Sequence, residues 1–254
     1  MTDIRNIGEH ECEEYLSVLC ESFGLDLARA RTAFFGEPYF SLDRKWALYN
    51  KRRIVSILTV VPIEFGDGHG IGIAGVATLE HERGEGLATA LLNHVVEHYE
   101  SAGAKKALLF ARADSLYRKS GFSILDKVYS QPLPAGRVAR PNQLNLEDVR
   151  NAYDRWAGED HRRLRRDDER WKYWAWTFKT ALAIDGGYFC YESNRVREIL
   201  PAFSRLPVAE HVDFYGTGEL AKDLGIEITE SGSDLLLMGR GFDYVPRMFM
   251  TDQF

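Results

Sequence analysis

The stretch Leu79-Glu-His-Glu-Arg-Gly-Glu-Gly-Leu-Ala-Thr-Ala-Leu-Leu92 decides how the first half of the chain folds. It follows an apolar run, residues 71–79, and leads into a segment with helical spacing of its apolar residues, so its glycines fall where a strand gives way to a helix. The first turn of a helix has unpaired N–H groups and the positive end of the helix dipole. Gly84 and Gly86 allow positive φ and close approach, and Arg83 adds a permanent cation. The stretch therefore predicts a site for pyrophosphate.

The residues after this stretch complete a strand, helix and strand unit. Residues 87–99 place their apolar side chains on one stripe of a helix, and Gly103 ends it. Residues 107–111 form a short apolar strand. A strand, a helix and a second strand in this order form a βαβ unit, which predicts an α/β layer for the first half.

The segments on either side of this unit are also predicted from their spacing. The glycine-rich residues 66–72 could indicate a second phosphate loop, but residues 71–79 are β-like, so a hairpin turn is favoured. The other predicted elements of the first half are helices at 9–23 and 25–35, a hairpin of 46–49 and 54–65, a helical turn at 114–120 and a strand from 121 to 125.

Three prolines and a glycine between residues 131 and 141 mark the best linker candidate. We place a boundary near residue 135, which divides the chain into domains 1–134 and 135–254. The mixed basic and acidic run 161–169 is interpreted as a solvated, salt-bridged surface. The second half is predicted as a smaller α+β unit, a degenerate copy of the first, with a helix at 146–156, a hairpin of 174–184 and 188–193, a strand at 208–215, a helix at 219–224 and a strand at 234–238.

Composition limits the classes of partner. The chain has 254 residues, of which 45% are hydrophobic and 28% charged, and its net charge is −6. This balance argues against nucleic acid as the main partner and mildly favours a cationic substrate. No apolar run reaches the roughly 18 residues that span a bilayer, and the N-terminus lacks a signal-peptide apolar region. We therefore expect a cytoplasmic protein with no membrane partner.

Three nucleotide-binding patterns compete for the glycine stretch. A dinucleotide fingerprint needs a third glycine where Thr89 stands, and a nucleotide-hydrolysing phosphate loop needs Gly-Lys-Ser/Thr, which is absent. The remaining pattern, Arg83-x-x-Gly86-x-Ala88, resembles the coenzyme A signature of the GNAT N-acetyltransferase superfamily. The resemblance implies the α/β (α+β) GNAT fold, a mixed central sheet flanked by helices, and acetyl-CoA as co-substrate.

A second motif reinforces the resemblance. Tyr117-Arg-Lys-Ser-Gly121-Phe122 is similar to the family's Tyr-x-x-x-Gly-Phe segment, whose tyrosine lies near the coenzyme sulfur. The resemblance implies that Tyr117 is a general acid for the departing thiolate, a task that suits a phenol with a pKa near 10.

The resemblance also implies which residues hold the coenzyme. The strand segment Val76, Ala77 and Thr78 would splay from its neighbour and offer backbone groups to the pantetheine arm. Arg112 and Ala113 would line the far side. The pyrophosphate would be held by main-chain N–H groups of the loop Arg83, Gly84, Glu85, Gly86, Leu87, Ala88 and Thr89.

Within the superfamily, the layout looks most like the tandem-domain branch of the enhanced intracellular survival proteins, without their third domain. In that branch the chain-terminal carboxylate enters the first domain's site as base. The resemblance therefore implies Phe254 as a catalytic residue, with Glu64 or a chain of waters as alternatives.

Two further patterns have competing interpretations. His94-Val-Val-Glu-His98 matches a zinc-protease pattern, but this helix is already committed to its apolar stripe and to the glycine loop, so we expect surface histidines and no metal. Aromatic residues in the second half could line a cleft for a cationic amine, but a core at the junction is favoured; they are Trp171, Trp174, Trp176 and Phe178.

Together these patterns predict an N-acetyltransferase that moves an acetyl group from acetyl-CoA to a primary amine of a small molecule or peptide. The alternative is a non-catalytic acyl-CoA binding or sensor module. The two share the glycine loop and differ in whether a base exists. A homo-oligomer stays open.

Overall fold

The computed structural model describes residues 3–133, 144–178, 181–184, 187–200, 212–229, 232 and 235–254. The boundary expected near residue 135 and the hairpin turn expected at residues 185–186 lie outside the described residues. So does the first part of the strand expected at residues 208–215.

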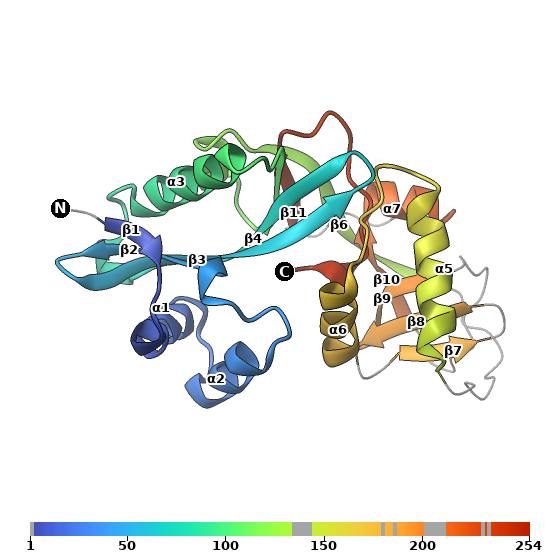
Figure 1. Cartoon of the computed structure of the whole chain (residues 1–254). Coiled ribbons are helices and arrows are strands. Elements are labelled where there is room, and N and C mark those ends of the chain that lie inside the picture. The colour runs from blue at the N-terminus through green and yellow to red at the C-terminus, as the bar shows by residue number, and fades with distance from the viewer. Residues whose placement is uncertain are drawn as a thin grey trace.

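One mixed sheet of eleven strands runs through both halves of the described structure (Figure 1). Its order is β1-β2-β3-β4-β5-β11-β6-β10-β9-β8-β7. The strands are β1 (Asp3–Asn6), β2 (Lys45–Asn50), β3 (Arg53–Phe65), β4 (Gly68–Thr78), β5 (Lys106–Ala111), β6 (Ser123–Leu133), β7 (Ala181–Ile184), β8 (Gly187–Glu192), β9 (Arg195–Leu200), β10 (Val212–Thr217) and β11 (Leu236–Arg240).

Helices cover both faces of the first half of this sheet. Helix α3 lies on one face of β2 to β4, and α1 and α2 lie on the other (Figure 1). The α-helices are α1 (Cys12–Phe23), α2 (Leu27–Gly36), α3 (Leu87–Ser101), α4 (Ser115–Arg118), α5 (Leu146–Gly158), α6 (Asp168–Thr177) and α7 (Gly218–Asp223). Short 3₁₀ turns span Glu9–Glu11, Leu42–Arg44, Glu80–Glu82 and Met250–Asp252.

The predicted βαβ unit is confirmed. Strands β4 and β5 pair in parallel from Gly70 opposite Lys106 to Ile73 opposite Leu109, and α3 connects them. The apolar stripe of α3 accounts for its position, because it is almost fully buried against the sheet at Leu91, Leu92, Val95 and Val96. Burying each such side chain contributes about 1.5–3 kcal/mol. The glycine-rich segment 66–72 forms the β3–β4 hairpin, as expected.

Strand β11 does not complete the second half, where we expected residues 234–238 to belong. It pairs antiparallel with β5, with Leu237 opposite Phe110, and with β6, with Leu237 opposite Asp126. A short apolar strand carries no information about its neighbours, so its sequence could not show this insertion. The sheet of the first half therefore contains, between β5 and β6, a strand from the last part of the sequence.

Residues 174–177 form the end of helix α6, so the strand expected over residues 174–184 was wrong for this part. The side chain of Asp167 caps the helix by accepting from the N–H of Arg170 at 2.7 Å. Trp171, Trp174 and Phe178 are buried at helical spacing, whereas Trp176 is 39% exposed. Trp171, Trp174 and Phe178 thus form core, as favoured from the sequence, whereas the expectation was wrong for Trp176.

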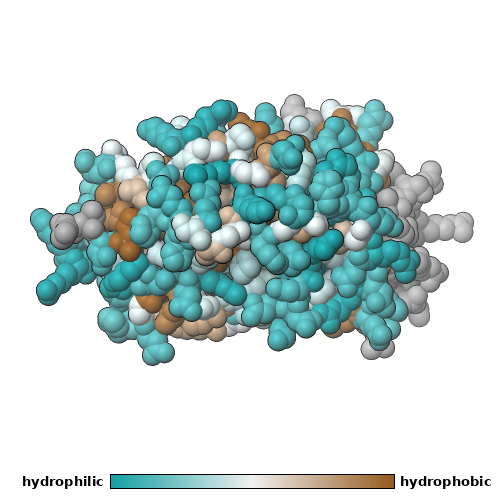
Figure 2. Space-filling view, turned by 45° about the horizontal axis from the view of Figure 1, so that its top comes forward, coloured by the Kyte–Doolittle hydropathy of each residue, from teal (hydrophilic) through white to brown (hydrophobic). Residues whose placement is uncertain are grey.

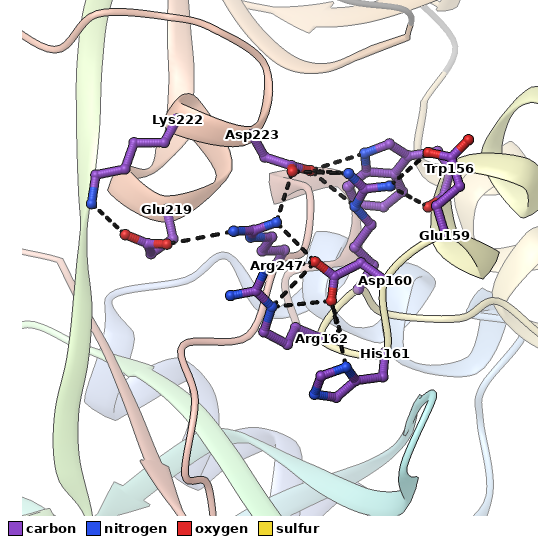
Figure 3. Close-up of polar contacts among 10 residues, drawn as sticks. Trp156, Glu159, Asp160, His161, Arg162, Glu219, Lys222, Asp223 and Arg247 are labelled. Carbon is purple, nitrogen blue, oxygen red and sulfur yellow. Dashed lines mark hydrogen bonds and ion pairs between the residues drawn. The ribbon is translucent and has the colours of Figure 1, made fainter.

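The run 161–169 was expected to be a solvated, salt-bridged surface, and the solvated part was wrong for Arg163 and Arg166, which expose 11% and 0% of their side chains. Arg163 donates from Nη2 to Asp223 at 2.8 Å. Arg247 donates from Nη1 to both Asp160 at 2.9 Å and Asp223 at 2.7 Å (Figure 3). Arg163, Arg247 and Asp223 expose 13% of their side chains or less. These pairs hold α5, α7 and the segment after β11 together.

The surface shown in Figure 2 is mostly hydrophilic, and the hydrophobic residues visible on it form small patches. Within the described part of the chain, no helix is both long and apolar enough to cross a membrane.

Candidate active site

The glycine stretch forms an open loop at the start of α3. Gly84 has φ +88° and Gly86 has φ +74°, and a Cβ atom at either position would meet nothing within 4 Å. Glycine is therefore needed here for backbone conformation and not for space. Gly86 is also the N-cap of α3, so no side chain caps the first turn. The unpaired N–H groups in the first turn of this fifteen-residue helix can therefore donate to an anion.

A hollow of about 280 Å³ lies at this helix end, and we call it the α3 hollow. Arg83 stands at its side, where Nε donates to the carbonyl of Thr78 at 3.1 Å. Helix α4 forms the opposite wall. The lining residues are Thr78, Glu82, Arg83, Gly84, Gly86, Leu87, Ala88, Thr89, Ser115, Leu116 and Lys119.

Most of the expected coenzyme loop therefore lines one hollow, but not all of it. Glu85, Arg112 and Ala113 are exposed and are not among the residues that line the α3 hollow. Ser115 and Lys119 were not foreseen. The expected helical turn at 114–120 was the available signal, because Ser115 and Lys119 lie one turn apart and share a face.

Strand β4 opens toward this site. Its pairing with β5 ends at Ile73, although β4 continues to Thr78, so the expected splay is present. On its other side the register shifts between Ala77 opposite Ile57 and Ala74 opposite Thr59, and Gly75 has φ +59°. Such a bulge bends the strand and frees backbone groups from the ladder. The segment Val76 to Thr78 leads from this bulge to the α3 hollow.

Tyr117 lies on α4 and packs against the core of the first half. Its carbonyl accepts the N–H of Phe122 at 3.1 Å across Gly121, which has φ +79°, so the Tyr-x-x-x-Gly-Phe motif forms one closed turn. Burial raises the pKa of the Tyr117 hydroxyl. Among the described residues, this hydroxyl has no hydrogen-bond partner, and Tyr117 is not among the residues that line the α3 hollow.

A second cavity, of about 260 Å³, adjoins the bulge, and we call it the α1/α2 cavity. It is lined by residues of α1, α2, β3, β4, α6 and the chain end, among them Gly75 and Phe254. The ring of Phe254 lies on β4, where a Cβ atom added to Gly72 would be 2.6 Å from it. Gly72 is therefore needed for space. The expected residue Phe254 thus lies in the first half of the molecule, beside β4 (Figure 1).

A buried ion network holds the segment that carries Phe254. Arg166 donates from Nη2 to Asp252 at 2.7 Å and from Nη1 to Glu198 at 3.0 Å, and all three side chains expose 1% or less. Its guanidinium also lies 3.7 Å from the ring centre of Tyr153. Burial acts to lower the pKa of Arg166, but the two carboxylates outweigh it and raise that pKa well above the usual value.

Arg170 adds the second positive charge of this network. It lies 3.7 Å from Asp252, and Nη2 donates to the carbonyl of Pro62 on β3 at 2.6 Å. Two cations therefore face two carboxylates, and the bond to Pro62 ties the chain end to the first half. Sequence reasoning missed this network, because Arg166 is 32 residues from Glu198 and 86 from Asp252.

Neither the alternative base Glu64 nor the two histidines of the zinc-protease pattern line these cavities. Glu64 is 42% exposed beside His69 and lines neither the α3 hollow nor the α1/α2 cavity. His94 and His98 are exposed and pack edge-on against Trp46. In the part of the chain that the structure describes, no three His, Cys, Asp or Glu side chains gather closely enough to hold a metal ion.

Comparisons with known proteins agree with this geometry. Residues 3–125 match the family model of the acetyltransferase (GNAT) domain. No curated protein matches the sequence. A GCN5-related N-acetyltransferase from Kribbella flavida has a similar structure, with a TM-score of 0.74, 18% identity, and coverage of 94% of this chain and 72% of the other.

Two more solved structures share the fold across both halves. A GCN5-related N-acetyltransferase from Anabaena variabilis gives a TM-score of 0.71 at 16% identity, with 94% of this chain and 72% of the other covered. Eis1 from Mycobacterium abscessus gives 0.65 at 14% identity, with 94% and 73% covered. Residues 3–125 therefore match the acetyltransferase (GNAT) domain model, and the chain shares the mixed α/β fold of these solved structures.

Proposed function

We propose that the protein transfers the acetyl group of acetyl-CoA to a primary amine. The observation that carries this proposal is the uncapped N-terminus of α3, with two positive-φ glycines, beside the open edge of β4. A pyrophosphate in the α3 hollow would accept hydrogen bonds from the amides that follow Gly86. The pantetheine arm would then follow Val76, Ala77 and Thr78 toward the bulge.

The α1/α2 cavity lies at the other end of this path and is proposed to hold the amine. The neutral nitrogen attacks the acetyl carbon, and the backbone N–H near Val76 stabilises the oxyanion. The carbon–sulfur bond then breaks. The α-carboxylate of Phe254 is proposed to accept the proton of the amine, and Tyr117 to donate a proton to the thiolate.

The raised pKa of Tyr117 keeps its hydroxyl protonated at neutral pH, as a general acid requires, although it also weakens the phenol as a donor. A phenol with a pKa above 10 stays protonated at neutral pH, and its ability to donate is lost only as the pH rises through that pKa. Tyr117→Phe should lower kcat by roughly a hundredfold, within the range for general acids, and leave coenzyme A affinity unchanged. The measurement is kcat from pH 7 to 10, with Tyr99→Phe as the control, because Tyr99 lies on the far end of α3. An unchanged kcat in Tyr117→Phe would remove its acid role.

Thiol release separates transfer from simple binding. The protein is incubated with acetyl-CoA and a panel of amines and peptides, and free thiol is followed with a chromogenic disulfide. Thiol release that depends on an amine supports the proposal. Tight binding of acetyl-CoA without release for any amine would favour the non-catalytic acyl-CoA sensor instead.

A further inference from the structure

The α1/α2 cavity has an apolar and aromatic wall. Tyr15, Phe34, Tyr39 and Tyr173 contribute rings, and Val60 and Ala74 contribute hydrocarbon from the sheet. Its volume of about 260 Å³ limits the part of a ligand that it encloses to a small group.

Every charged side chain on this wall already has a partner. Of the described residues that line the cavity, three have charged side chains: Glu37, Lys45 and Arg170. Lys45 is bound to Glu37, with Nζ 2.7 Å from Oε1, and exposes 4% of its side chain. Arg170 is held by Asp252 and by the carbonyl of Pro62. The cavity therefore has no carboxylate left to receive a second ammonium group.

The hydroxyl groups of the wall are partly satisfied in the same way. Tyr15 and Thr59 share a hydrogen bond of 2.8 Å, which uses one of the two O–H donors on that side. The entrance is apolar too, because Leu25 lines the cavity and is 48% exposed. Exposed apolar side chains beside it on α1 and α2 are Phe23, Leu27 and Phe35.

We infer that the acceptor is a small hydrophobic monoamine, with one amino group on an alkyl or arylalkyl body, and not a polyamine or aminoglycoside. Burial of the hydrocarbon drives binding, whereas a second buried ammonium without a carboxylate is costly. This inference rests on the proposed function, because the bound amine is an acetyl acceptor only if the protein transfers acetyl groups. It differs from the expectation that the net charge of −6 favours a cationic substrate, because that charge lies outside the cavity.

A matched pair of amines tests the inference. Hexylamine and 1,6-diaminohexane have the same chain and differ only in the second amino group. Binding of each to the protein saturated with coenzyme A is measured by calorimetry at pH 8. Hexylamine should bind at least about tenfold more tightly. A diamine that binds as tightly as hexylamine, or more tightly, would overturn the inference.

A pair of substitutions on α2 locates the binding. Ala30 lines the cavity, whereas Ala28 is exposed on the same helix and does not line it. Ala30→Leu should weaken hexylamine binding at least about fivefold, because the larger side chain fills the space, and Ala28→Leu should not. Leucine suits a helix at both positions. Unchanged hexylamine binding in Ala30→Leu would place the amine elsewhere and overturn the inference.

Turnover tests this inference separately from the proposed acetyl transfer. Hexylamine that binds in the cavity but causes no thiol release from acetyl-CoA would contradict acetyl transfer and leave the ligand chemistry of the cavity supported. Thiol release that is faster with the diamine than with hexylamine would support transfer and contradict the inference.

Discussion

The α3 hollow and the α1/α2 cavity flank the same strand, β4, but they are built in opposite ways. The α3 hollow is formed mainly by one short stretch of the chain, Glu82 to Thr89 without Glu85, and the contacts proposed there are with backbone N–H groups. The α1/α2 cavity is formed by side chains of α1, α2, β3, β4, α6 and the chain end, which span the whole sequence. We propose that the first binds the pyrophosphate of the coenzyme and that the second selects the acceptor.

This difference extends to what holds each region in place. The loop of the α3 hollow depends on two glycines whose φ angles are positive. The wall of the α1/α2 cavity depends on a buried network centred on Arg166, which fixes the segment before Phe254. The two regions should therefore fail differently when they are mutated.

The largest effect should come from the buried network. Arg166→Ala leaves Glu198 and Asp252 with too little positive charge in a region closed to water, so the free energy of unfolding should fall by about 3–5 kcal/mol. Arg162→Ala is the control, because Arg162 is 34% exposed in its pair with Asp160 and should lose at most about 1 kcal/mol. Urea denaturation measures both. A loss below about 1 kcal/mol in Arg166→Ala would show that the network does not hold the chain end.

The next effect should come from the glycine loop. Gly86→Ala forces a side chain into a left-handed conformation, at a cost of about 1–2 kcal/mol, and should weaken coenzyme A binding at least about tenfold as the loop distorts. Gly225→Ala is the matched control, because Gly225 has φ +69°, has open space around it and lies after α7. Both variants should lose similar stability. Equal coenzyme A affinity in the two variants would contradict the assignment of this loop as the pyrophosphate site.

The smallest effect should come from a charge at the rim of the α3 hollow. Lys119→Ala should weaken coenzyme A binding about threefold at low salt, and less at high salt, because an exposed cation contributes about 0.2–1 kcal/mol. Lys127→Ala serves as the control, since Lys127 lies on β6 and does not line the hollow. A Lys119 variant whose affinity matches the wild type at every salt concentration would remove this residue from the site.

The sequence predicts the α3 hollow well because its information is local. Residues 71–101 form a strand, a glycine loop and a helix in direct succession, so local spacing is enough to predict their order. The residue type of Gly84 and Gly86 permits the positive φ that both adopt. Lys119 was missed because it enters through the packing of α4 on α3, which spacing alone does not show.

The α1/α2 cavity could not be predicted in the same way. In the sequence, Arg166 is one charge in a run that is typical of a surface. Only the structure shows that it is buried and paired with Glu198 and Asp252. Strand β11 likewise has the pattern of any short apolar strand, and only its pairing shows that it belongs between β5 and β6. Residues 174–177 were interpreted as the start of a strand, whereas they form the last turn of α6, which begins after the cap at Asp167.

The most direct test of the account compares coenzyme A with pantetheine, which lacks the pyrophosphate and the adenosine. If the amides at the start of α3 bind the pyrophosphate, coenzyme A should bind at least about 100-fold more tightly by calorimetry, a difference of about 2.7 kcal/mol. Equal affinities for the two ligands would contradict the account, because the α3 hollow would then contribute nothing to coenzyme binding.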